Sequence, residues 1–132
     1  MIVVLDASAA IEVVLQRKHA KQLGILIQES DWLIAPSLFI SEISNVFWKY
    51  HKISNYSLTD CEKNIEQAIA LPDDYINDIE LYREAFNLGC MLEHPVYDML
   101  YLVLARRNNA TLLTMDKKLN KAAHKTNIKT IF

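Results

Sequence analysis

Two aspartates stand directly after apolar segments that are typical of buried strands. Asp6 follows residues 1–5, and Asp116 follows residues 111–115. Ligands of open α/β sheets bind at the carboxyl ends of the strands, so we expect both carboxylates at that edge. An aspartate between a strand and a helix is also an ordinary N-cap, and neither position is decisive alone.

Two further acids interrupt apolar helical sequence. Asp98 is the one charged residue in 96–105, with no Lys or Arg three or four positions away, so we expect a metal ion or a distant base to balance its charge. Glu42 lies between apolar positions, and Asn45 follows about one turn later. The ordinary alternatives are a helix-start acid and a boundary glutamate that reaches solvent.

Acids gathered at one sheet edge would repel one another unless a cation lay between them. Hard oxygen ligands with room for water favour Mg²⁺, with Mn²⁺ as a substitute. Zinc is disfavoured because the histidines lack metal-site spacing. These are His19, His51, His94 and His124, which we expect at the surface or in loops.

Short apolar runs alternate with longer helical stretches. The expected strands are 1–5, 32–35, 75–76, 111–115 and 128–132, and the expected helices are 8–16, 19–28, 36–51, 58–71, 80–89, 96–108 and 117–125. Ser8 is the expected cap of its helix, Pro36 suits a first turn, and Gly89 suits a helix end. This alternation, without hairpin signals, favours an α/β fold with a parallel sheet covered on both faces.

The composition favours one soluble domain. The 132 residues are 52% hydrophobic, enough for a single core over 1–132. Two cysteines without a CxxC pair favour a reducing, cytoplasmic setting. No apolar run reaches the roughly 20 residues of a membrane span, and the start lacks a basic leader. With two glycines, the chain has no phosphate-binding glycine loop.

Charge is unevenly distributed along the chain. Residues 54–98 hold ten acids and two bases, whereas 106–132 hold seven bases and one acid. Screening confines such fields to about 10 Å, so a basic zone can attract phosphate although the net charge is −2. An equally good reading is a solvated helix face.

Four segments resemble the motifs of the PIN-domain family, in particular its VapC-type toxins. They are VVLDASAAIE, SEISNVFWKY, HPVYDMLYLVLARR and TLLTMDKKL, and they appear in the family's order over nearly the whole chain. YDMLYLVLA and the Thr-x-Asp at 114–116 are the most specific parts. Residues 53–92 carry little family signature.

The resemblance implies a site and a fold. The catalytic acids would be Asp6, Glu42, Asp98 and Asp116, with Asp6, Asp98 and Asp116 as metal ligands and with Ser8, Asn45 and Thr114 in support. The fold would be a PIN-like three-layer structure, with about five parallel strands between helices. The family is commonly dimeric.

The resemblance also implies an activity and partners. The chain would be a Mg²⁺-dependent ribonuclease, in which metal-activated water hydrolyses RNA and leaves a 5′-phosphate. A protein antitoxin would inhibit it. Lys117, Lys118 and Lys121 are candidate contacts to the RNA backbone. The target RNA and the antitoxin's identity stay open.

Three other readings compete with the nuclease. A module of the same fold with a degenerate site would bind RNA or a partner without cleaving. A haloacid-dehalogenase phosphatase needs a second Asp where Ser8 stands. A receiver domain needs an Asp after a central strand and a Lys after a later one, and neither pattern is evident. The intact set of acids favours the nuclease.

Overall fold

The computed structural model describes residues 1–131, and within them it contains five strands and seven α-helices. The strands are β1 (Ile2–Leu5), β2 (Trp32–Pro36), β3 (Asp74–Ile76), β4 (Thr111–Leu113) and β5 (Thr130–Ile131). The helices are α1 (Ala7–Val14), α2 (Ala20–Glu29), α3 (Leu38–Ser54), α4 (Leu58–Ile69), α5 (Tyr82–Leu92), α6 (Val96–Arg107) and α7 (Lys117–Lys125), with a 3₁₀ turn η1 (Asp78–Glu80) before α5.

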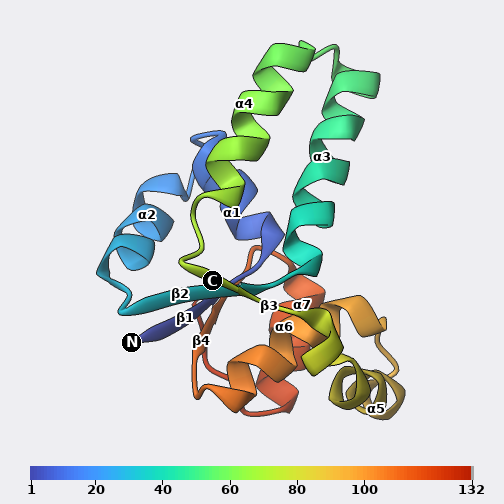
Figure 1. Cartoon of the computed structure of the whole chain (residues 1–132). Helices are drawn as coiled ribbons and strands as arrows, with labels where there is room; N and C mark the ends of the chain where they lie inside the picture. Colours follow the sequence, from blue (N-terminus) through green and yellow to red (C-terminus); the bar gives the residue numbers. More distant parts are fainter. Residues whose placement is uncertain (132) are drawn as a thin grey trace.

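The five strands form one parallel sheet in the order β3-β2-β1-β4-β5. Figure 1 shows α1 to α4 on one side of the sheet and α5 to α7 on the other, with α3 and α4 side by side and extending beyond it. The prediction of an α/β fold with a parallel sheet between two helical layers is confirmed. The order reverses at β1, so the switch point lies between β1 and β4.

The two most apolar segments of the chain form the centre of the core. Val3, Val4 and Leu5 of β1 are fully buried, as expected for a strand covered on both faces. In α6, residues 99–105 are all buried, and this helix packs against β1, β2 and β4. Continuous apolar sequence thus marks the central strand and the helix that covers it.

Two predictions about helix starts are wrong. Asp6, not Ser8, holds the N-cap position of α1, and the Ser8 hydroxyl bonds to the Asp6 carboxylate. Pro36 closes β2 instead of opening α3, which begins at Leu38 after Ser37. Proline has no backbone N–H, and the next donor along the chain, the N–H of Ser37, bonds to the backbone oxygen of Ile76 in β3.

The glycine expected to end a helix lies inside it. α5 continues through Gly89 to Leu92. A Cβ at Gly89 would lie 2.8 Å from the backbone oxygen of His94 and 3.3 Å from a methyl carbon of Val96. Gly89 therefore allows the loop after α5 to pass close to the helix.

The remaining differences are at chain ends and boundaries. β5 covers Thr130–Ile131, within the strand expected at 128–132, of which Phe132 lies outside the described residues. β4 ends at Leu113, so Thr114 lies just beyond the strand. In residues 1–131, no helix has the length and apolar character to cross a membrane.

Candidate active site

Hydrogen bonds around Asp6 join the ends of β1 and β4. Thr114 and Ser8 donate hydroxyl hydrogen bonds to Asp6 Oδ2, over 2.7 Å and 2.6 Å. The Ser8 hydroxyl accepts from the backbone N–H of Met115 at 2.9 Å. Asp6 and Thr114 are buried, so this network fixes the Asp6 carboxylate at the carboxyl edge of the sheet.

Asp116 caps α7. Its Oδ1 accepts from the backbone N–H groups of Lys118 and Leu119, over 2.9 Å and 3.3 Å. Its own N–H donates to Thr114 Oγ1 at 3.0 Å. The N-cap role considered from the sequence is real. It uses one carboxylate oxygen, and Oδ2 has no donor in the described part of the chain.

Glu42 is half-buried on α3 and accepts a hydrogen bond from the Tyr101 hydroxyl on α6. Tyr101 is fully buried. Burial, together with the charges of Asp6 and Glu42, holds the pKa of Tyr101 far above its ordinary value, so its hydroxyl stays a donor. Sequence reasoning gave Tyr101 no role, although it lies three residues after Asp98 and hence near it on the helix surface.

Asp98 lies in the first turn of α6 and pairs with His94 in the preceding loop. His94 Nε2 is 2.8 Å from Asp98 Oδ2, and the two side chains are 13% and 17% exposed. The expectation of a metal ion or a distant base beside Asp98 thus overlooked a nearby hydrogen-bonding partner, His94. The signal in the sequence is a spacing of four residues, which suits histidine as well as Lys or Arg.

The four acids meet at one open cavity of about 240 Å³. Its lining residues are Asp6, Ala7, Ser8, Ile11, Glu42, Asn45, Val46, Asp98 and Asp116. None of these described residues is Lys, Arg or His. Thr114 lies behind the wall, bonded to Asp6. The cavity is thus acidic and lies at the switch point of the sheet.

Burial, and to a smaller extent the closeness of the acids, raises two of their pKa values. Burial is the main cause of the raised pKa of Asp6, and the charges of Asp98 and Asp116 add to it, against hydroxyl hydrogen bonds that lower it. Burial raises the pKa of Glu42 to about 7, and the other three acids contribute by repulsion. A cation in the cavity would relieve this repulsion.

The cavity fits a hard divalent cation in its donor chemistry. Each of the four acids engages protein donors through one oxygen, so within residues 1–131 the other carboxylate oxygen of each has no such donor. Carboxylate oxygens are the ligands that Mg²⁺ and Mn²⁺ prefer. However, no three His, Cys, Asp or Glu side chains among the described residues are arranged so that they could hold one ion between them.

The predicted RNA-contacting lysines lie outside the acidic cavity. Lys117, Lys118 and Lys121 are exposed on α7. Lys118 and Lys121 line a separate basic cavity, whereas Lys117 is not among its described lining residues. Lys118 and Lys121 therefore share a cavity to which Lys117 does not contribute.

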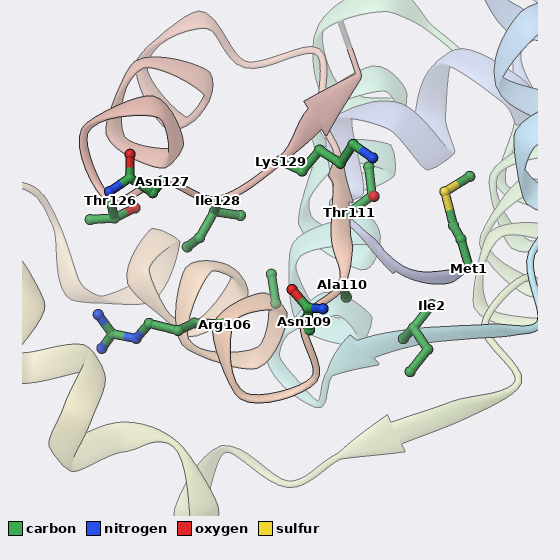
Figure 2. Close-up of a pocket in the computed structure, with 11 residues that line it drawn as sticks. Met1, Ile2, Arg106, Asn109, Ala110, Thr111, Thr126, Asn127, Ile128 and Lys129 are labelled. Atoms are coloured by element: carbon green, nitrogen blue, oxygen red, sulfur yellow. The ribbon is translucent and has the colours of Figure 1, made fainter.

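A larger cavity of about 310 Å³ lies at the opposite edge of the sheet (Figure 2). Ile2 and Thr111, which begin β1 and β4, help to line it. Arg106 also lines it, but its guanidinium bonds to Glu84. None of the described lining residues is acidic, so this cavity is not the carboxylate site.

Comparison with known proteins gives one matching family and solved structures with a similar fold. Residues 3–125 match the family model of the PIN domain. PAE2754 from Pyrobaculum aerophilum has a similar solved structure, with a TM-score of 0.74 and 20% identity over 91% of this chain and 78% of that one. A second similar structure is a chain of VapBC2 from Rickettsia felis, solved bound to a DNA fragment from the VapBC2 promoter. Its TM-score is 0.64 and its sequence identity is 17%, over 99% of this chain and 98% of that one.

This chain belongs to the PIN-domain family, since the family model covers nearly all of it. At such low identities, the two solved structures support the fold alone. No curated protein sequence matches significantly.

Proposed function

We propose that this chain is a metal-dependent endoribonuclease of the VapC toxin type. The observation that carries the proposal is the cavity in which Asp6, Glu42, Asp98 and Asp116 meet without a basic side chain among its described lining residues. Bringing acids from four separate elements together at the switch point of a sheet does not favour folding, because burial, with their mutual repulsion in addition, raises the pKa of Asp6 and of Glu42. Membership of the PIN-domain family supports a nuclease.

The residues around the acidic cavity would have different roles in the reaction. Asp6, Asp98 and Asp116 would hold a divalent ion, Mg²⁺ or Mn²⁺, through the oxygens that lack a protein donor, once their side chains turn towards a common point that they do not share without the ion. Ser8 and Thr114 keep the Asp6 carboxylate oriented. When bound, such an ion supplies positive charge for the phosphoryl oxygens and acidity to the attacking water.

Glu42 is suited to proton transfer. Its pKa of about 7 lies near the pH at which a general base is most effective. The Tyr101 hydroxyl holds one oxygen of Glu42, and Glu42 lines the cavity, so its other oxygen would be the one that accepts the proton. Asn45, exposed at the cavity margin, is placed to hydrogen-bond the RNA.

Cleavage of single-stranded RNA by the purified chain tests the proposal. We expect cleavage with Mg²⁺ or Mn²⁺, none with EDTA, and a loss of at least about 100-fold in Asp98→Asn. The matched control is Asp60→Asn, because Asp60 is exposed on α4 away from the cavity. Products should carry 5′-phosphate. Cleavage that persists in EDTA would contradict the proposal.

Ion binding needs a measurement of its own. Calorimetric titration of Mn²⁺ should detect binding to the wild type and to Asp60→Asn, and much weaker binding to Asp6→Asn. Equal binding to all three proteins would place the ion elsewhere.

One observation favours a second candidate function. No three metal-ligating side chains are arranged around a common point among the described residues. This observation favours an RNA-binding or partner-binding module of the same fold. The same experiments separate the two functions. RNA binding that is equal with Mg²⁺ and with EDTA, without cleavage in either, supports the module.

We also propose that a protein antitoxin inhibits this chain and that the chain forms a homodimer. The similarity to VapBC2 supports the first part. Expression of the wild type should arrest growth, while expression of Asp98→Asn should not.

Light scattering tests the homodimer. It should give about twice the chain mass of 15.2 kDa, and a monomer mass would remove the dimer from the proposal.

A further inference from the structure

A basic cavity of about 170 Å³ lies between α7 and the end of α5. Its lining residues are Leu92, His94, Lys118, Lys121, Ala122 and Lys125. None of these described residues is acidic, in contrast to the carboxylate cavity.

The three lysines share one side of α7 and have no carboxylate partner. Lys118, Lys121 and Lys125 stand at spacings of three and four residues, so they project from one face. Within residues 1–131, none of them forms an ion pair. Three unneutralised ammonium groups around one small cavity repel one another, and an anion would remove that repulsion.

His94 connects this cavity to the proposed active site. It lines the basic cavity, and its Nε2 bonds to Asp98, which lines the carboxylate cavity. The acidic and the basic cavity are thus separated by one pair of side chains. Neighbouring phosphates of one nucleic-acid strand are anions that can occupy two such adjoining cavities.

We propose that the basic cavity binds a backbone phosphate of the RNA that neighbours the phosphate to be cleaved. This inference rests on the nuclease proposed above and adds a second, fixed anchor to it. A bound neighbouring phosphate would set the register of the strand without reading its bases. It also predicts that Lys118, Lys121 and Lys125 act as one site, while Lys117 does not belong to it.

Binding of a short single-stranded RNA in EDTA, measured by fluorescence anisotropy across a salt series, tests this prediction without cleavage. One phosphate contact on a single strand contributes about 0.7 to the slope of log affinity against log salt. We expect a loss of about 0.7 in the slope for the triple variant Lys118→Gln, Lys121→Gln, Lys125→Gln. Three separate contacts would remove about 2 instead.

Lys117→Gln is the matched control, since Lys117 is an exposed lysine of the same helix outside the basic cavity. It should retain the wild-type slope, and all variants should keep the wild-type Tm because these side chains are exposed. A slope loss of about 0.7 in Lys117→Gln as well would overturn the site in favour of a diffuse basic surface. Failure of the wild type to cleave with Mg²⁺ would instead overturn the nuclease and leave the binding result standing.

Discussion

A different kind of donor holds each carboxylate of the acidic cavity. Hydroxyl groups hold Asp6, a phenol holds Glu42, an imidazole holds Asp98, and backbone N–H groups hold Asp116. Hydrogen bonds to an ionised acceptor are worth about 1.5–3 kcal/mol. Each acid can therefore be misoriented by changing its donor, with the acid itself left in place.

Tyr101→Phe is the simplest such change. The substitution keeps the buried ring and removes the hydroxyl that holds Glu42. We expect kcat to fall roughly tenfold with KM nearly unchanged, as for a lost hydrogen bond of about 1.4 kcal/mol. Because that hydrogen bond lowers the pKa of Glu42, its loss should also move the acidic limb of the pH–rate profile to higher pH.

Tyr97→Phe controls for this prediction. Tyr97 lies on the same helix with 54% of its surface exposed, and it has no contact with Glu42 that the described residues show. A similar loss in both variants, or an unshifted pH profile in Tyr101→Phe, would show that Tyr101 acts only in packing.

Glu42→Gln should stabilise the metal-free protein in alkaline solution only. Burial raises the pKa of Glu42 from 4.5 to about 7, so the folded state binds this proton more tightly than the unfolded chain. The stability that the proton contributes is complete below about pH 4.5 and is lost as the pH rises through about 7. Above that range, glutamine removes a partly buried charge.

Thermal unfolding in EDTA measures this effect. Since part of the Glu42 side chain is screened by solvent, we expect a gain of roughly 1 kcal/mol, or about 3 °C in Tm, near pH 8.5. Near pH 4.5 the two proteins should unfold together. Glu62→Gln, at an exposed position of α4, should show no such dependence. A Glu42→Gln gain of the same size at both pH values would argue against the raised pKa of Glu42.

At the scale of elements, a local sequence pattern predicts that a helix or strand exists better than it predicts where that helix or strand begins and ends. The apolar run of β1 and the helical periodicity of α7 are encoded in adjacent residues, and both elements lie where we expected. The predictions for Pro36 and Gly89 were wrong because the roles of these residues depend on contacts with other segments, β3 for Pro36 and the loop after α5 for Gly89. Gly89 is required by the loop that carries His94, five residues later, and no helix-ending signal encodes that approach.

Gly89→Ala tests whether this junction positions His94. The new Cβ would lie 2.8 Å from the backbone oxygen of His94, so the loop must move or α5 must bend. We expect a loss of about 1–3 kcal/mol in stability and a loss of cleavage activity larger than the fraction unfolded explains. Guanidinium denaturation and kinetics on the folded protein measure the two effects.

Gly24→Ala is the matched control, because a Cβ at Gly24 in α2 meets nothing within 4 Å. This variant should gain roughly 0.5–1 kcal/mol through reduced backbone freedom and keep full activity. If both alanine variants are equally stable and active, the close approach at Gly89 has no consequence.

At the scale of the whole molecule, the sequence predicts which acids come together but not what surrounds them. Parallel strands and their switch point bring the segments after β1 and β4 to one edge, so Asp6 and Asp116 could be placed from topology. The contacts of Glu42 with Tyr101 and of His94 with Asp98 depend on how α3, α5 and α6 pack. Sequence periodicity does not determine such packing.

Mn²⁺ should stabilise the whole fold if Asp6, Asp98 and Asp116 share an ion. Binding to the native state alone adds about 2.7 kcal/mol at 100 times Kd, which is a rise of roughly 8 °C in Tm for a chain of this size. The rise should be larger above about pH 7, because Glu42 and Asp6 must lose protons whose binding burial favours. Asp6→Asn should remove most of the rise, and Asp60→Asn should leave it intact. The same rise in Asp6→Asn as in the wild type would mean that Mn²⁺ binds outside the acidic cavity and that the convergence of the acids there has another cause.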